Sequence, residues 1–252
     1  MKKLEEKLKE FLSRRENQIG YYIQNGLVNC FGDVKITDED LVDGKLPFEF
    51  GSIFCDFSYY NCHSLTSLKG SPQKVYGNFI CFDCPSLTSL EGCPEKVSFD
   101  FICYDCPLIT SLEGSPQEVG GNFGCLDCKN LTSLIGSPKE IFGDFGCSGC
   151  TSLTSLKGAP QKVGWTFSCY NCTSLTSLEG CPKEVGGNFY CFGCKNLTSL
   201  FGCPEKIGGN VDCSNCTSLT SLDFIPYAIG RRIRVSPEMK LDVDVDVDVD
   251  ID

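Results

Sequence analysis

The stretch Gly187-Asn188-Phe189-Tyr190-Cys191-Phe192-Gly193-Cys194-Lys195-Asn196-Leu197-Thr198-Ser199-Leu200 is the centre of a unit that recurs every 22 residues, eight times, without insertion or deletion. Written as a pattern, the unit is F-x-C-x-x-C-x-x-L-T-S-L-x-G-x-P-x-x-V-x-G-x. A fixed period of this length is too short for a pair of helices, and it indicates a solenoid built of short strands. Because no coil of this size can bury its own apolar face, the coils must be stabilised by stacking on one another.

The apolar positions of the unit form rows that continue from coil to coil. The first cysteine of the unit is Cys81, Cys103, Cys125, Cys147, Cys169, Cys191 and Cys213, with Tyr59 in its place in the first coil. The second cysteine is Cys62, Cys84, Cys106, Cys128, Cys150, Cys172, Cys194 and Cys216. An aromatic row precedes them, at Phe57, Phe79, Phe101, Phe123, Phe145, Phe167 and Phe189, and it closes with Val211. Two leucine rows and one β-branched row complete the predicted core.

The alternation of residues within the unit predicts which side chains point inward. Phe79 and Cys81 alternate with Ile80 and Phe82, and a period of two is that of a β-strand. We therefore expect Phe79 and Cys81 to point into the core and Ile80 and Phe82 to point outward. Strands of neighbouring coils should pair ~4.8 Å apart, so that eight coils make a rod about 40 Å long.

The unit resembles a known repeat family. Its F-x-C-x-x-C-x-x-L core is similar to the L-x-L-x-x-N/C-x-x-L core of leucine-rich repeats, with cysteine where that family usually has asparagine. Its second half, L-T-S-L-x-G-x-P-x-x-V-G-G-x-F, looks like a repeat common in uncharacterised bacteriophage and gut-bacterial proteins and like the short bacterial leucine-rich repeats with L-x-S-L-P. The resemblance covers roughly residues 33–235 and implies a leucine-rich-repeat-like fold that binds other proteins. Because cysteine replaces the asparagine that bonds the turn, the backbone groups of the turn must find other partners.

The chain divides into four predicted parts. Residues 1–17 read as an amphipathic helix with Leu4, Leu8, Phe11 and Leu12 on one face, which we interpret as a cap on the first coil; a helix that binds a partner or a second copy is the alternative. Residues 18–52 read as an entry hairpin, signalled by Asn25-Gly26, and an irregular first coil. The solenoid occupies residues 53–235.

Residues 236–252 form an acidic tail in which aliphatic residues and aspartates alternate strictly from Leu241 to Asp252. Two interpretations remain open. The tail adds to the solenoid as a final edge strand, with its aspartates blocking further pairing, or it is a disordered acidic segment. Calcium binding by the aspartates is disfavoured, because the glycine and the terminal glutamate of an EF-hand loop are absent.

Composition and charge exclude several classes of function. The net charge is −11, and no basic stripe is present, which argues against a nucleic-acid-binding protein. The N-terminus lacks the apolar core of a signal peptide, and no apolar run is long enough to span a membrane. We therefore predict a reducing cytosol, bacterial or that of an infected host cell, in which the 20 cysteines are small buried hydrophobic residues.

The cysteines also raise the possibility of a metal site, since seven C-x-x-C pairs look like halves of zinc sites. The pairs recur identically in every coil, however, and an inward-facing row explains all of them at once, so no metal or cofactor is expected. No enzyme is expected either. The single histidine, His63, is the only imidazole available as a base, and no nucleotide-binding loop or zinc-protease pair is present.

The outward row of the strand varies where the core rows are uniform, as a recognition surface would. Two aromatic groups are expected, around Ile80, Phe82, Ile102 and Tyr104 and around Tyr170, Tyr190 and Phe192, with a small polar region at Gly146 and Ser148 between them. The candidate binding residues are Tyr60, Ile80, Phe82, Ile102, Tyr104, Leu126, Tyr170, Tyr190 and Phe192. Exposed apolar groups of this kind mark interfaces, and Tyr and Phe are common anchors.

The sequence thus predicts a monomeric, non-catalytic scaffold that binds a protein. Three alternatives stay open: stacked aromatics that only favour strand pairing, a structural component of a virion or a cell surface that assembles end to end, and a metal-binding protein.

Overall fold

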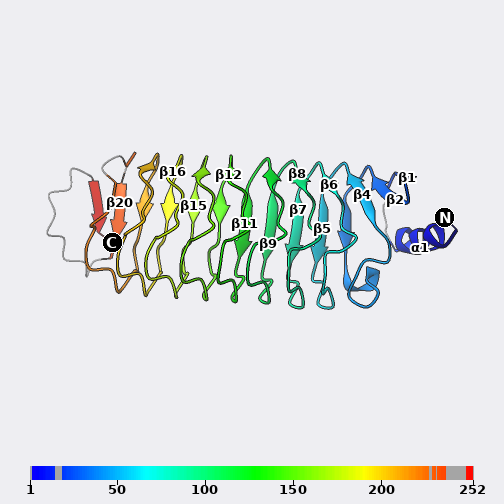
Figure 1. Ribbon diagram of the computed structural model, residues 1–252, viewed down its shortest axis with the longest axis horizontal. Coiled ribbons are helices and arrows are strands. Elements are labelled where there is room, and N and C mark those ends of the chain that lie inside the picture. The colour runs from blue at the N-terminus through cyan, green and yellow to red at the C-terminus, as the bar shows by residue number, and fades with distance from the viewer. Residues whose placement is uncertain (1, 15–18, 227–228, 231, 237–247, 252) are drawn as a thin grey trace.

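The chain folds as a long solenoid of parallel β-coils with one α-helix at its N-terminal end (Figure 1). This computed structural model describes residues 2–14, 19–226, 229–230, 232–236 and 248–251. The predicted fold class, an all-β repeat solenoid with an N-terminal helix, is confirmed. The regular repeats do not make up the whole solenoid, because strands precede the first of them and follow the last.

One side of every coil contributes a strand to a single 11-stranded parallel sheet. Its strands, in spatial order from the N-terminal end, are β3 (Val34–Ile36), β5 (Phe57–Tyr60), β7 (Phe79–Phe82), β9 (Phe101–Tyr104), β11 (Phe123–Leu126), β13 (Phe145–Gly146), β15 (Phe167–Ser168), β17 (Phe189–Tyr190), β19 (Val211–Asp212), β20 (Arg232–Val235) and β21 (Asp248–Ile251). The register is that of the repeat, with Phe79 opposite Phe101 and Cys81 opposite Cys103. Each position of the unit therefore lies over the same position of the next coil.

A second side of the coils carries shorter strands in two sheets. The six-stranded sheet contains β1 (Tyr21–Gln24), β2 (Leu27–Cys30), β4 (Phe50–Ile53), β6 (Lys74–Val75), β8 (Lys96–Val97) and β10 (Glu118–Val119). The four-stranded sheet contains β12 (Glu140–Ile141), β14 (Lys162–Val163), β16 (Glu184–Val185) and β18 (Lys206–Ile207). Strands β1 and β2 form an antiparallel hairpin around Asn25 and Gly26, as the sequence predicted.

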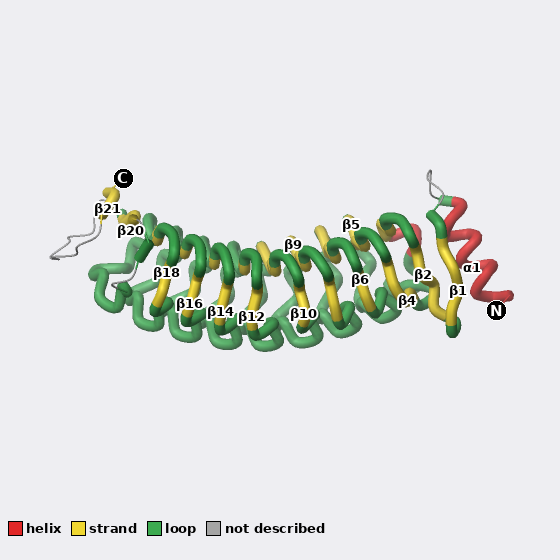
Figure 2. The backbone as a smooth tube through the Cα atoms, turned by 90° about the horizontal axis from the view of Figure 1, so that it is seen from above, coloured by secondary structure: helices red, strands yellow, loops and turns green. Residues whose placement is uncertain are grey.

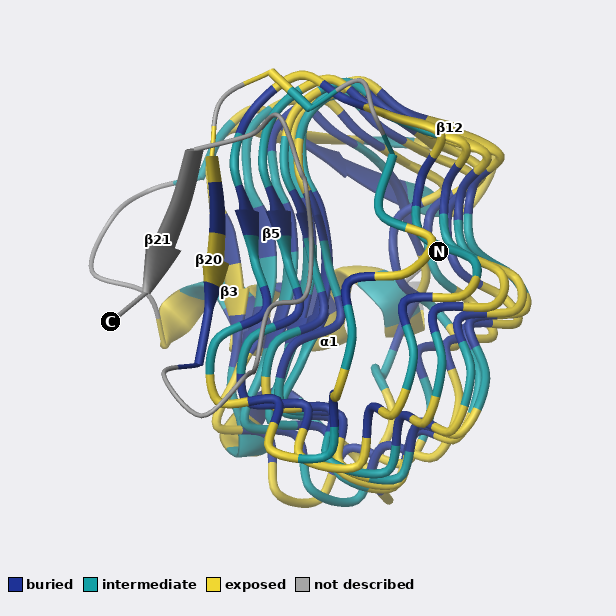
Figure 3. Cartoon of the chain, turned by 90° about the vertical axis from the view of Figure 1, so that its left-hand side faces the viewer, coloured by how far each residue is buried: buried dark blue, intermediate teal, exposed yellow. Residues whose placement is uncertain are grey.

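Seen along the solenoid, the 11-stranded sheet and the shorter strands lie on different sides of the coils (Figure 3). Seen from above, the rod is gently bowed, and the 11-stranded sheet follows the inner side of the bow (Figure 2). This sheet therefore forms the concave face of the rod.

The core consists of the predicted rows. The phenylalanine side chains are buried and stack along the rod, with ring centroids 5.5 Å apart for Phe123 and Phe145 and 5.4 Å apart for Phe145 and Phe167. Both cysteine rows and both leucine rows are also buried. Side chains of one kind repeat along each row because the in-register parallel pairing brings equivalent positions together.

Thiols of the second cysteine row bond backbone carbonyl groups. The thiol of Cys172 donates to the carbonyl oxygen of Cys147 at 3.2 Å, and the thiol of Cys194 donates to that of Cys169 at 3.1 Å. The same contact recurs for Cys216, which donates to Cys191 at 3.1 Å. Each of these three thiols therefore bonds a carbonyl of the preceding coil.

A row of Asp and Asn side chains closes the other end of the strands. The backbone N–H of Asn122 donates to Asp100 Oδ1 at 2.7 Å, and the N–H of Asp144 donates to Asn122 Oδ1 at 2.7 Å. Asn78 similarly donates its backbone N–H to Asp56 Oδ1 at 2.7 Å. These side chains bond the backbone of the next coil just before each strand begins, and so they fix the coil spacing at this corner.

The helix α1 (Lys2–Ser13) covers the N-terminal end of the core. Leu8 and Phe11 are buried, and the ring of Phe11 packs edge-on against Phe48 and Phe50 at centroid distances of 5.2 and 5.9 Å. The apolar face predicted from the sequence is thus the face that caps the rod.

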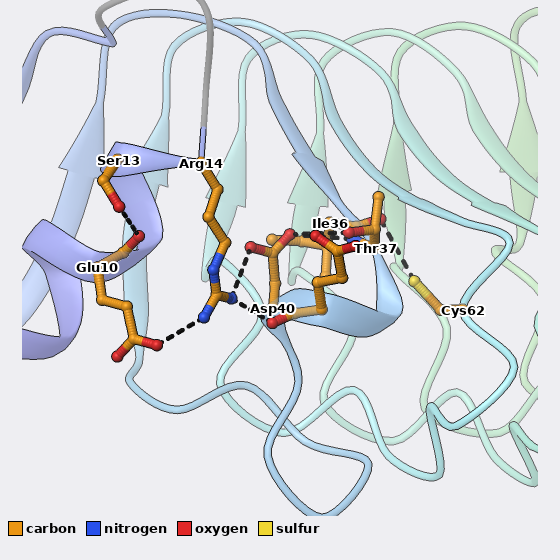
Figure 4. Close-up of polar contacts among 8 residues, drawn as sticks. Glu10, Ser13, Arg14, Ile36, Thr37, Asp40 and Cys62 are labelled. Carbon is orange, nitrogen blue, oxygen red and sulfur yellow. Dashed lines mark hydrogen bonds and ion pairs between the residues drawn. The ribbon is translucent and has the colours of Figure 1, made fainter.

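Polar contacts also hold this helix to the first coil (Figure 4). Arg14 reaches Glu10 Oε1 at 2.6 Å and Asp40 Oδ1 at 3.7 Å, and it also donates to the carbonyl oxygen of Glu39. Asp40 ends the short 3₁₀ helix η1 (Asp38–Asp40) and accepts the backbone N–H of Thr37 at 3.0 Å. Arg14 therefore joins the end of α1 to a fixed turn of the solenoid.

The C-terminal end is closed by two strands outside the regular repeats. Strand β20 supplies the buried side chains of Ile233 and Val235, and β21 pairs with it in parallel, with Asp248 opposite Arg232. Of the two interpretations of the acidic tail, the structure therefore has an edge strand over residues 248–251. Residues 237–247 and 252 lie outside the described part of the chain.

Candidate functional site

The candidate site is the outward face of the 11-stranded sheet. In β7 and β9 the side chains alternate between buried and half-buried, so that Ile80, Phe82, Ile102 and Tyr104 lie on the outer face as predicted. Tyr60 at the end of β5 is the most exposed of this group, at 39%. The strand period thus separates core from surface at each of these positions.

Three rings at the N-terminal end form a continuous stack, which we call the N-terminal stack and define as Tyr60, Phe82 and Tyr104. The centroids of Tyr60 and Phe82 are 4.9 Å apart with an angle of 11° between the ring planes. Those of Phe82 and Tyr104 are 5.1 Å apart with an angle of 6°. The stack follows from the in-register pairing of β5, β7 and β9, which sets equivalent side chains one strand spacing apart.

A second group, the C-terminal stack, consists of Tyr170, Phe192 and Tyr190. The rings of Tyr170 and Phe192 are stacked 4.6 Å apart, and Tyr190 meets Phe192 edge-on at 6.4 Å. Tyr190 ends β17, whereas Tyr170 and Phe192 lie in the turns that follow β15 and β17. The predicted strand is therefore two residues shorter in these coils, although the backbone N–H of Cys169 still donates to the carbonyl of Tyr190 at 2.8 Å.

The segment between the two stacks contains small residues and Leu126. Leu126 is half-buried, and its side chain lies over the space that a Cβ atom of Gly146 would occupy, 3.0 Å away. Ser148 is only 2% exposed and shares a hydrogen bond of 2.9 Å with Ser168. Six of the nine candidate residues are therefore aromatic and form two separate groups, with Leu126 between the groups, but Ser148 offers little polar surface there.

Sequence reasoning missed a row of residues beside the stacks, at the position just before the second cysteine. These residues are Asn61, Asp83, Asp105, Asp127, Gly149, Asn171, Gly193 and Asn215, and all of them have φ between 50° and 73°. Asn, Asp and Gly adopt this left-handed conformation more readily than other residues, so the restricted composition was a readable signal for a turn.

Charged groups lie close to the N-terminal stack. Lys35 Nζ is 4.0 Å from the centroid of the Tyr60 ring, and His63 Nε2 is 3.4 Å from Asp83 Oδ2. The neighbouring carboxylate of Asp127, which also shares a hydrogen bond with the phenol, raises the pKa of Tyr104. This end of the face therefore combines aromatic rings with carboxylates.

The C-terminal end of the face differs in charge. A hollow of about 280 Å³ is lined by Tyr190, Asn210, Val211, Asp212, Arg232 and Arg234. Arg234 Nη1 lies 3.8 Å from Asp212 Oδ2. Arginines therefore adjoin the C-terminal stack, whereas carboxylates adjoin the N-terminal stack.

A second exposed aromatic row was not predicted. It lies at the corner that follows the shorter strands, where Phe31, Phe54 and Tyr76 stack with centroids 5.1 Å apart at each step. Phe142 and Trp165 extend the same corner and are 73% and 68% exposed. The sequence signal was the two positions after the β-branched row, which hold Tyr76, Phe142 and Trp165 where most other coils have glycine.

Most of the cysteines are buried in the core. All 20 are unpaired thiols, and burial raises the pKa of Cys81 and raises that of Cys203 to about 12. The thiol of Cys62 donates to the carbonyl oxygen of Ile36 at 3.3 Å, and the adjacent His63 is turned to Asp83. Within the described ranges, no three Cys, His, Asp or Glu side chains are grouped so that they could hold a metal ion.

Two general findings complete the description of the chain. Among the residues with described structure, no helix combines the length and apolar character needed to cross a membrane. Comparisons with protein-family models, with curated proteins and with solved structures found no match to this chain.

Proposed function

We propose that the protein is a non-catalytic scaffold that binds a protein partner through the concave face of its 11-stranded sheet. The observation that carries this proposal is the presence of two aromatic stacks on the outer side of that sheet. Rigid aromatic side chains on an ordered surface supply much of the binding energy at protein interfaces.

The stacks are not needed to pair the strands. The equivalent position is held by Leu126 and Ser148 in the two coils between the stacks, and Phe145 still pairs in register with Phe123 and Phe167. Aromatic cross-strand pairs contribute some stability, but the fold tolerates their absence in the middle of the rod. This supports a role for Tyr60, Phe82, Tyr104, Tyr170 and Phe192 beyond strand pairing.

A structural role through end-to-end assembly is the second candidate. The ends of the rod count against it, since α1 covers one end of the core and β21 pairs with β20 at the other. A protein that grows by stacking would be expected to leave complementary edges open. We therefore propose a monomeric binder, active in a reducing compartment that keeps its thiols free.

The test is capture of a partner from a lysate of the source cells by the intact protein and by two double variants. Tyr170→Asp with Phe192→Asp introduces charge into the C-terminal stack. Phe142→Asp with Trp165→Asp introduces the same charge at exposed aromatic residues of the other corner and is the matched control. A partner captured by the intact protein and the control, but lost from the first variant, is the expected result.

Circular dichroism must first show that both variants keep the spectrum of the intact protein. A partner that the Tyr170 and Phe192 variant retains would move the site away from the C-terminal stack. If no partner is captured and the mass from light scattering rises with protein concentration, the structural role is the better description.

A further inference from the structure

Three carboxylates run beside the N-terminal stack. Asp83, Asp105 and Asp127 directly follow Phe82, Tyr104 and Leu126 in three successive coils, and their φ values are 52°, 50° and 53°. All three residues are half-buried. Because neighbouring coils are ~4.8 Å apart, the carboxylates form a row whose ends are about 10 Å apart.

The fold does not require acidic residues at these positions. Later coils hold the same left-handed turn with Gly149, Asn171, Gly193 and Asn215, none of which is charged. Like charges at this spacing repel one another, so three consecutive aspartates weaken the stacking of the coils that carry them. The charge is therefore confined to the part of the face that also carries the N-terminal stack.

A lysine and a histidine of the protein already contact one end of this surface. Lys35 from β3 places Nζ over the ring of Tyr60 at 4.0 Å, and His63 lies 3.4 Å from the carboxylate of Asp83. A cation over an aromatic ring and a nitrogen-bearing side chain beside a carboxylate are both favourable contacts. These two contacts show which ligand chemistry suits the surface at Asp105 and Asp127.

We propose that this surface, made of the N-terminal stack, Ile80, Ile102 and the row of aspartates, binds an extended basic segment of the partner protein. The inference rests on the proposed function and specifies the partner's chemistry. A segment in the polyproline II conformation has three residues per turn and advances about 3.1 Å per residue, so arginines or lysines three positions apart lie on the same side and are separated by about 9 Å. This separation matches that of Asp83 and Asp127, which lie two coils apart. The apolar residues between the basic ones would lie on Ile80, Ile102 and the ring edges.

The test uses a fluorescein-labelled peptide, Arg-Leu-Ser-Arg-Leu-Ser-Arg, and fluorescence anisotropy. The probe variant is Asp83→Asn, Asp105→Asn and Asp127→Asn, which keeps the turn because asparagine holds it in other coils. The control variant is Glu95→Gln, Glu113→Gln and Glu205→Gln, which removes the same charge at exposed positions away from this face. We expect the asparagine variant to bind the peptide about tenfold more weakly and the control to bind it as the unchanged protein does.

Three results would overturn the assignment. The first is that the peptide does not bind the unchanged protein, and the second is that it binds all three proteins with equal affinity. The third is that both variants bind the peptide more weakly by the same factor, which would mean that net charge alone sets the affinity. If any of these results is found while partner capture still depends on Tyr170 and Phe192, the proposed function is retained. Only the assignment of a basic segment as the ligand is then wrong.

Discussion

The stacked phenylalanine row makes a quantitative prediction about how the solenoid is held together. Phe145 is fully buried, and its ring is stacked between Phe123 at 5.5 Å and Phe167 at 5.4 Å. Replacing it with alanine removes both ring contacts and leaves a cavity in the middle of the rod. Three residues away, Phe142 is 73% exposed, so Phe142→Ala is a control of the same chemistry without burial.

The expected magnitude follows from burial. A fully buried phenylalanine replaced by alanine costs about 3–5 kcal/mol, because lost transfer energy adds to the cost of the cavity. An exposed substitution changes the free energy of unfolding by roughly 0.5 kcal/mol or less. Because each coil contacts only its neighbours, the loss also uncouples the two halves of the rod, and we expect a broader unfolding transition.

The assay is urea unfolding of both variants and the unchanged protein, followed by far-ultraviolet circular dichroism. We expect Phe145→Ala to lower the urea midpoint strongly and to lower the slope of the transition, while Phe142→Ala leaves both unchanged. A loss of less than about 1 kcal/mol for Phe145→Ala, or equal losses for both variants, would refute the view that the phenylalanine row couples the coils.

Three further predictions concern the turns, the coil spacing and the thiols. Asp105 has a φ of 50°, so Asp105→Ala should lower the free energy of unfolding by about 1 kcal/mol while Asp105→Asn leaves it unchanged; equal urea midpoints would contradict this. A Cβ at Gly186 would lie 2.1 Å from a carbonyl oxygen of the preceding coil, so Gly186→Ala should lower the free energy of unfolding by about 1–3 kcal/mol. The control is Gly32→Ala, where the nearest atom would lie 3.7 Å from the new Cβ, and it should have little effect on the thermal midpoint. Burial raises the pKa of Cys81 and of Cys203 above the unfolded value of about 8.5. Above about pH 8.5 the unfolded chain therefore releases protons that the folded state keeps. The free energy of unfolding should be constant below this pH and should fall above it by up to about 1.4 kcal/mol per pH unit for each such thiol. A urea midpoint that stays constant from neutral pH to about pH 9.5 would show that the thiols are not protonated and buried.

Local patterns in the sequence were sufficient to predict the solenoid and its inward and outward rows. The alternation of Phe79 and Cys81 with Ile80 and Phe82 separates core from surface, because successive residues of a strand point to opposite sides. The 22-residue period then sets equal residues over one another, and from this the aromatic groups on the outer face could be anticipated. These features depend on contacts between equivalent positions of successive repeats, and such positions can be identified directly from the sequence.

Other features depend on contacts between different positions, which the sequence does not display. Examples are the burial of Ser148 by its hydrogen bond to Ser168 and the contact of Lys35 with the ring of Tyr60. The row of Asp83, Asp105 and Asp127 beside the N-terminal stack also became apparent only once the turn was seen. Each of these joins residues from different coils or from different rows of the unit.

The acidic tail shows most clearly where the sequence stops being sufficient. Its strict alternation predicted a strand with an aliphatic face and an acidic face, but shifting such a pattern by two residues leaves it unchanged, so the sequence could not select a register. The structure places Asp248 opposite Arg232 and Val249 opposite Ile233. The sequence alone determined the repeat, the strand period and the core rows, because these follow from local alternation and a fixed period. Only the tertiary structure decided where the last strand pairs, because that register is set by the contact of β21 with β20, which are separate in the sequence.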